Sequence, residues 1–245
     1  MIRYISLMVG SLFILSTLLC ALDADTILQK MDEVADYTTS KTDAVMKIID
    51  RDGNETTMKL IAYEKRSEQS TKQLMRFTYP ARLNGTAVLV VEDSIWYYNK
   101  RTNRVRLLSK SAKKGSMMGS SFTYEDISTD YKKEFTAQIL DSNKKRYKLK
   151  LIPTDPDKKY KYIIAYVNTD NFIAEKMEYF NKNDLKYKAM SASDITVING
   201  HLAPVKIEMT DLETQKITLF EIIKDSAAYD INLPDEMFTE RDLKK

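Results

Sequence analysis

The sequence predicts a mainly β protein in which one long antiparallel sheet curves over a single apolar helix. The chain has 245 residues, of which 43% are hydrophobic and only 6 are Gly and 5 Pro, so it can bury a substantial core. One short segment has helical periodicity, and it is followed by runs rich in Val, Ile, Tyr, Thr and Phe with turn residues between them. Because twisted open sheets rarely exceed ~10 strands, so long a sheet must close, split into two layers or have one face covered. With one substantial helix available, a curved sheet wrapped over that helix is the most economical arrangement.

The first 24 residues form a predicted signal peptide. An apolar run from Ile5 to Leu19 follows Arg3 and ends in small and polar residues. The run is shorter than the ~20 residues that a membrane span requires. Cys20 stands where a bacterial lipoprotein has its acylated cysteine, but Leu19 replaces the small residue of that motif. Cleavage near 19/20, 21/22 or 24/25 therefore stays open, and so does lipidation at Cys20. We expect an exported, periplasmic protein that is either soluble or anchored through Cys20.

The predicted helix covers residues 25–37. Apolar side chains recur at three- and four-residue spacing, and Asp25 can cap the N-terminus. Its apolar face consists of Ile27, Leu28, Met31, Val34 and Ala35.

The strand pattern continues from there almost to the C-terminus. Turns such as Asp52-Gly53, Asn84-Gly85 and Asn199-Gly200 separate the apolar runs. We expect strands near 43–50, 56–65, 71–79, 86–92, 94–99, 103–109, 133–140, 145–152, 160–167, 172–180, 185–195, 201–211 and 215–224. Period-two spacing predicts an apolar lining on one face and charged residues on the other. The expected lining includes Met46, Ile48, Met58, Leu60, Ala62, Leu74, Phe77, Val88 and Val90.

Two segments depart from the strand pattern. Residues 109–122 are the longest stretch without it, and we expect a loop or lid there. Near the C-terminus, Pro234 can open a short helical turn. No internal linker or repeat interrupts the chain, so residues 25–245 are predicted to form one domain.

Composition excludes several functions. The net charge of +3 is spread along the chain, which is unlike a nucleic-acid-binding protein. One Cys and one His cannot form a Cys/His zinc site, and we expect neither a metal nor a cofactor. Asp50, Asp52 and Asn54 alternate like calcium ligands but are better explained as a hairpin turn. The 12 Met, 15 Tyr and 8 Phe fill the core, and the flexible Met side chains also suit a pocket of irregular shape.

Catalysis has few candidate residues. His201 is the only possible histidine base, and no Gly-x-Ser-x-Gly motif is present. Ser116, Ser120 and Ser121 are the serines that a lipid-acting hydrolase could use. Glu92-Asp93 and Glu125-Asp126 could supply paired carboxylates. A hydrolase and a tethered structural envelope lipoprotein therefore stay open as alternatives to a binding protein.

Residues 80–126 carry a more specific pattern. It consists of Pro80, Gly85-Thr86-Ala87, Ile95-Trp96-Tyr97-Tyr98, Arg104-Val105-Arg106 and the stretch from Ser116 to Asp126. This pattern resembles the bacterial outer-membrane lipoprotein-sorting protein family, the relatives of the periplasmic lipoprotein carrier LolA. Two positions depart from the family: Lys100 stands in place of proline and Ser121 in place of aspartate.

The resemblance implies a half-open β-barrel covered by helices, with an interior that accepts phospholipid or lipoprotein acyl chains. It implies a carrier for lipoprotein sorting, or an accessory to an envelope lipid transporter, which meets an inner-membrane transporter or an outer-membrane acceptor. No catalyst is needed for that role. The residues expected at the cavity or its rim are Trp96, Tyr98, Met117, Met118, Phe122, Tyr124 and Met31. Arg104 and Arg106 are expected to contact lipid head groups or a partner.

Overall fold

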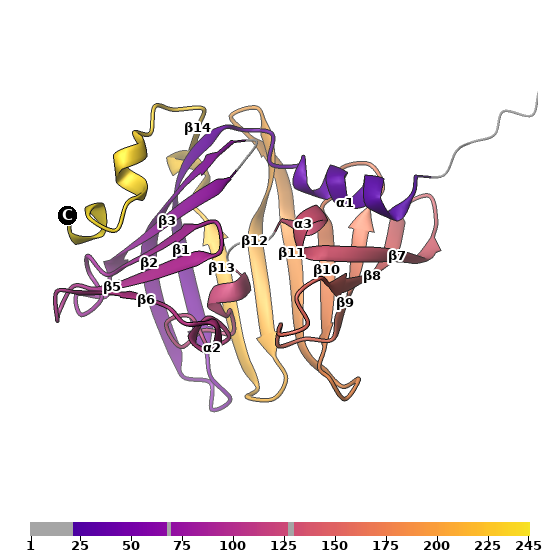
Figure 1. Ribbon diagram of the computed structural model, residues 1–245, viewed down its shortest axis with the longest axis horizontal. Coiled ribbons are helices and arrows are strands. Elements are labelled where there is room, and N and C mark those ends of the chain that lie inside the picture. Colours follow the sequence, from indigo (N-terminus) through magenta and orange to yellow (C-terminus); the bar gives the residue numbers. More distant parts are fainter. Residues whose placement is uncertain (1–21, 68–69, 127–129) are drawn as a thin grey trace, which may run out of the picture.

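The computed structural model describes residues 22–67, 70–126 and 130–245. Most of the predicted signal peptide, including Cys20, lies outside the described residues. The protein is built on one antiparallel sheet of 14 strands that remains open (Figure 1). The bounds of the strands are β1 Thr39–Ile49, β2 Glu55–Arg66, β3 Thr71–Tyr79, β4 Ala87–Val91, β5 Ser94–Asn99, β6 Arg104–Leu107, β7 Phe135–Ser142, β8 Arg146–Pro153, β9 Tyr162–Asn168, β10 Ala174–Phe180, β11 Lys186–Ile198, β12 His201–Asp211, β13 Lys216–Ile222 and β14 Ala228–Tyr229.

The chain meanders outward from the centre of the sheet and then back to it. The strand order is β6-β5-β4-β3-β2-β1-β13-β12-β11-β10-β9-β8-β7, and β14 pairs with β1. At the centre, Ala44 of β1 pairs with Ile222 of β13. The edges β6 and β7 are joined by a connection that contains the short helices α2 (Lys110–Lys113) and α3 (Tyr131–Glu134) and the 3-10 turn η1 (Tyr124–Asp126). This connection has to cross from one edge of the sheet to the other, and the predicted loop at 109–122 is part of it.

The longest helix among the described residues, α1 (Ala24–Asp32), covers the β7–β11 half of the sheet (Figure 1). Asp23, rather than Asp25, is its N-cap and accepts a hydrogen bond of 2.7 Å from the Thr26 amide. The helix ends at Asp32 instead of continuing to Tyr37 as predicted, because the chain turns there to enter β1. Its buried residues Ile27, Leu28 and Met31 pack in a core that includes Leu149, Ala165 and Met177. Among the described residues, none of the helices has the length and apolarity to span a membrane.

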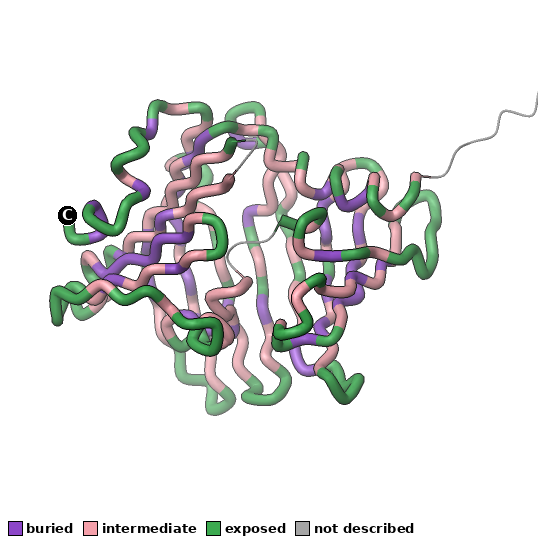
Figure 2. Tube along the Cα trace, in the orientation of Figure 1, coloured by how far each residue is buried: buried purple, intermediate pink, exposed green. Residues whose placement is uncertain are grey.

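The apolar face predicted from period two forms the core of the β1–β5 half. Met46, Met58, Phe77 and Val88 belong to one buried cluster. Buried positions alternate with more exposed ones along β1, whereas β4 is buried on both faces (Figure 2). Leu74 is an exception to the prediction: it lies on the opposite face, because it is three positions away from Phe77 and side chains alternate along a strand.

The pattern predicted charged residues on this opposite face. On β3–β5 the face is instead apolar and covered. The C-terminal segment folds back over it and buries Leu233, Phe238 and Leu243 against Leu74 and Leu89. The segment contains two 3-10 turns, η3 (Asp235–Phe238) and η4 (Asp242–Lys244). Pro234 precedes η3, so the predicted terminal helical turn is confirmed.

Candidate functional site

The described part of the connection after β6, residues 109–126, forms a compact structure that we call the crossover segment. Its central part is a small hairpin, in which Ser116 bridges Thr123 and the Met117 amide donates a 2.8 Å hydrogen bond to the Phe122 carbonyl. Met118 and Gly119 have positive φ angles of 53° and 84° and turn the chain at the tip. The glycine that the sequence places there therefore meets a conformational requirement.

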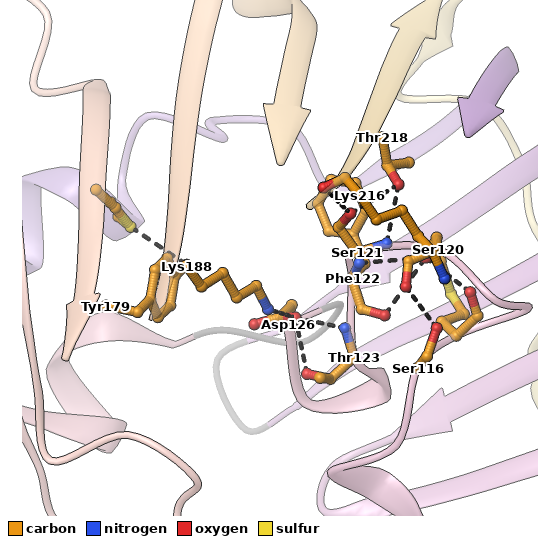
Figure 3. A network of polar contacts seen from close by, with 12 residues as sticks. Ser116, Ser120, Ser121, Phe122, Thr123, Asp126, Tyr179, Lys188, Lys216 and Thr218 are labelled. Carbon is orange, nitrogen blue, oxygen red and sulfur yellow. Dashed lines mark hydrogen bonds and ion pairs between the residues drawn. The ribbon is translucent and has the colours of Figure 1, made fainter. Parts of the chain in front are cut away.

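Ser121 anchors the crossover segment to β13 (Figure 3). Its amide donates a 2.8 Å hydrogen bond to Thr218 Oγ1, and its hydroxyl donates one of 2.9 Å to the Lys216 carbonyl. Lys216 Nζ returns a 2.8 Å hydrogen bond to the Gly119 carbonyl. Thr218 is fully buried, so these hydrogen bonds satisfy polar groups that water cannot reach. The serine that departs from the family pattern thus has a structural partner in this chain.

A buried ion pair anchors the same segment to β11. Lys188 Nζ binds Asp126 Oδ2, and the two side chains are only 4% and 7% exposed. The carboxylate also accepts the amide and, at 2.7 Å, the hydroxyl of Thr123, while the ammonium lies 5.2 Å from the ring centroid of Tyr179 (Figure 3). Asp126 therefore pairs with a lysine. The acid–base alternative required a second carboxylate in that place.

A cavity of about 340 Å³ lies between the crossover segment and the sheet. Met117 and Phe122 line it from the crossover segment, and Val34 and Ala35 line it from the chain that leaves α1. The strands supply Ala62, Met75, Leu202, Ala203, Pro204, Ile207, Phe220 and Ile222. These apolar side chains come from both halves of the sheet. The cavity therefore depends on the pairing of β1 with β13, which joins the two halves.

One end of the cavity is polar. Glu64 accepts hydrogen bonds from Tyr37 (3.4 Å) and Gln73 (3.1 Å) and pairs with Arg66. Because the Gln73 amide nitrogen is held by this carboxylate, its oxygen points elsewhere, and that buried oxygen has no partner among the described residues. Burial, together with the Glu64 charge, raises the pKa of Tyr37 well above its ordinary range, so its hydroxyl stays protonated.

The cavity continues into two neighbouring hollows. One of 220 Å³ lies beneath α1 and shares Val34 and Ile207 with the first, and one of 920 Å³ shares Ala35 and Tyr37 and is flanked by Asp32 and Arg66. Burial raises the pKa of Asp32 to about 6, although its carboxylate accepts the Tyr131 and Lys132 amides. The apolar cavity thus adjoins polar groups at the end of α1.

The residues predicted at the site do not all gather there. Met117 and Phe122 line the cavity, and Met31 lines the hollow beneath α1. Met118 and Tyr124 pack against the same core without lining the cavity. Burial next to Tyr97 raises the pKa of Tyr124 to about 12.

Trp96 and Tyr98 lie elsewhere. They pack on the other face of β5 under the C-terminal segment, since they alternate with Ile95 and Tyr97, which face the concave side. Arg104 and Arg106 are exposed on the edge strand β6.

Sequence reasoning missed the polar contributions of Glu64, Gln73 and Lys188. Each alternates with neighbours in a strand like an ordinary solvent-facing residue, so period two alone could not identify them. Only the way the strands curve around the crossover segment places them inside.

The residues of the hydrolase alternative are not arranged for nucleophilic catalysis. The hydroxyls of Ser116, Ser120 and Ser121 donate to the main-chain carbonyls of Ser120, Met117 and Lys216 respectively. His201 instead binds two carboxylates, with Nδ1 2.6 Å from Asp36 and Nε2 3.3 Å from Asp230. Within the described ranges, no group of three or more His, Cys, Asp and Glu is placed to hold a metal ion.

Comparisons with known proteins assign the chain to a family. A family model described as "-like: Uncharacterized protein" matches residues 69–245. No curated protein matches the chain.

Solved structures share the fold over nearly its whole length. A DUF1329 family protein from Desulfovibrio piger has a TM-score of 0.84 at 24% identity, covering 89% of this chain and 97% of that one. An outer membrane lipoprotein-sorting protein domain from Vibrio parahaemolyticus has a TM-score of 0.83 at 21% identity, covering 90% and 98%. A LolA superfamily protein from Nitrosomonas europaea has a TM-score of 0.73 at 21% identity, covering 90% and 99%. The chain therefore belongs to the family that the matching model describes, and its open sheet has the fold of the LolA superfamily of outer membrane lipoprotein-sorting proteins.

Proposed function

We propose that the protein is a periplasmic carrier that shields lipid acyl chains in the cavity beneath its crossover segment. The observation that carries this proposal is the apolar lining of that cavity, to which Met117 and Phe122 of the crossover segment and Met75 and Phe220 of the sheet contribute. An acyl chain gains ~0.8 kcal/mol for each CH₂ group that leaves water. Burial of a chain in this lining is therefore sufficient to hold a lipid without any covalent step.

The size of the cavity fits an acyl chain. Its 340 Å³ lies near the lower end of the ~300–1,000 Å³ that ligand pockets occupy. The two adjoining hollows, which share Ala35 with it, supply further space toward the end of α1. Met31, Met75 and Met117 line these spaces, and their flexible side chains can adjust to chains of different length.

The polar end of the cavity is suited to a lipid head group. The Gln73 oxygen is a buried acceptor with no donor among the described residues, and leaving such an atom unpaired costs ~1–3 kcal/mol. A head-group hydroxyl or an amide N–H at the peptide end of the ligand would satisfy it. Glu64 is already neutralised by Arg66, so this end does not require a charged ligand.

The biological setting follows from the same proposal. The cargo is the acylated part of a phospholipid or a lipoprotein, and the protein receives it from an inner-membrane transporter or passes it to an outer-membrane acceptor. Residues 25–245 act as one lipid-binding domain, soluble or anchored through Cys20.

Native mass spectrometry with lipid extraction tests the carrier function on protein purified from an exporting bacterial host. We expect near-stoichiometric lipid on the wild-type protein. Ala62→Trp fills the cavity and should abolish this lipid, whereas Ile61→Trp, at the next position on the opposite face of β2, should retain it. A clean apo mass together with no uptake of added lipid would leave a tethered structural role as the better account, and the intact mass also reports acylation of Cys20.

A further inference from the structure

A group of Lys and Arg side chains at one edge of the sheet does not line the cavity. Between Asp93 and Glu125 the sequence contains seven Lys and Arg and no acidic residue. Lys110 and Lys113, in α2, have acceptors in the described residues, since Lys110 lies 3.8 Å from Asp157 and Lys113 donates to the Asp93 carbonyl. The others include Lys100, Arg101, Arg104 and Arg106, which occupy the β5–β6 turn and the edge strand β6.

A second turn adds a fifth cation to this group. The Lys100 stem packs against the β3–β4 turn, where a Cβ atom added to Gly85 would lie 3.3 Å from Lys100 Cγ. Arg82 belongs to that neighbouring turn. We call Arg82, Lys100, Arg101, Arg104 and Arg106 the basic edge. All five are exposed, and none forms an ion pair with another described residue.

The basic edge borders the concave face that contains the cavity. Arg106 pairs across the strands with Tyr97, which packs in the concave core, so Arg104 and Arg106 extend from the same face. Leu107 alternates to the other face and is 62% exposed. The strand that carries them lies along the outer border of the sheet (Figure 1).

We infer that the basic edge docks the protein on an anionic phospholipid bilayer. The inference rests on the proposed carrier function, because docking there brings the concave face to the membrane from which lipid is taken or to which it is given. Uncompensated Lys and Arg are attracted to anionic head groups. Pairing with a partner strand is disfavoured, since a four-residue edge strand carrying two arginines is of the kind that resists strand addition.

Vesicle flotation tests the inference with the purified protein. Vesicles of phosphatidylcholine alone are compared with vesicles containing about one third phosphatidylglycerol, at low and high salt. We expect binding only to the anionic vesicles and a loss of at least about tenfold at high salt, where exposed charges are screened within ~3 Å. The variant Arg101→Glu/Arg104→Glu/Arg106→Glu should lose binding to a similar extent.

A matched control separates position from net charge. Lys144→Glu/Lys145→Glu/Lys176→Glu makes the same change in charge at exposed positions of the other half of the sheet and should keep most of the binding. Equal losses in the two triple variants, or unchanged binding by the arginine variant, would overturn the inference. Uptake of a short-chain fluorescent lipid from solution is measured on all three proteins. If uptake fails in the wild type as well, the carrier function is wrong, whereas loss of vesicle binding with normal uptake isolates the basic edge.

Discussion

At the scale of single residues, the Lys188–Asp126 pair is the most consequential contact of the site. Both side chains are almost fully buried, and each compensates the charge of the other. The same carboxylate holds Thr123, so the pair fixes both the position of the crossover segment and its local fold. Removing one partner leaves a buried, uncompensated charge, which typically costs ~3–5 kcal/mol.

A double-mutant cycle measures this coupling. Lys188→Met and Asp126→Asn should each lower the free energy of unfolding by ~3–5 kcal/mol. The double variant should lose less than the sum by at least ~1 kcal/mol, because no lone charge is left. Urea unfolding of the four proteins provides the values. Strictly additive losses would show that the two charges act independently.

Asp32 makes stability depend on pH. Its carboxyl has a pKa of about 6 in the folded protein because burial raises it from the ordinary 3.8. Between these two values the native state binds a proton that the unfolded state does not, so this group favours folding increasingly as the pH falls from 7 toward 4. Asp32→Asn should remove that increase, as measured by urea midpoints across this range. An unchanged pH profile in the variant would assign the titration to another group.

At the scale of elements, local signals were enough to locate the strands and most of their inward faces, but not the face of every side chain. The strands predicted from 43–50 to 215–224 all form, most within about two residues at each end, because alternation and turn residues act over short distances. The residue at which α1 ends, and the faces of the sheet on which Trp96 and Leu74 lie, depend on the segments that pack against them. The family resemblance placed Met117 and Phe122 among the expected cavity residues, and both line the cavity. Neither the resemblance nor the strand pattern pointed to Glu64 or Gln73.

The anchor of the crossover segment on β13 gives a prediction for one element. Thr218→Val keeps the shape of the side chain but removes the acceptor of the Ser121 amide, which should cost ~1–3 kcal/mol. Amide hydrogen exchange should increase in residues 115–126 while β2 and β3 stay protected. Thr210→Val, on the convex face of β12, is the control and should leave exchange in the segment unchanged. Equal exchange in both variants would argue that other contacts hold the segment.

At the scale of the whole molecule, the chain runs outward from the centre of the sheet and then returns to it. The first strand therefore depends on the last strands for its pairing. The edge of β1 that faces away from β2 pairs with β13 and β14, and the crossover segment depends on hydrogen bonds to Lys216 and Thr218. The C-terminal segment then covers the apolar outer face of β3–β5, including Leu74 and Tyr98. The cavity cannot exist until nearly the entire chain has been made, since both halves of the sheet contribute to its lining.

A chain that ends at Asp211 should therefore fail to fold cooperatively, because it leaves β1 as an unpaired edge and exposes the outer face of β3–β5. A chain that ends at Thr239 is the comparison: it keeps β13, β14 and Phe238. It loses the η4 turn with buried Asp242 and Leu243 and the main-chain acceptors of Arg76, so it should fold with reduced stability. Circular dichroism and urea unfolding distinguish the two. A sharp transition in the shorter chain, with a slope in proportion to its length, would mean that β1–β12 fold together without the β1–β13 pairing, and it would contradict this dependence on the last strands.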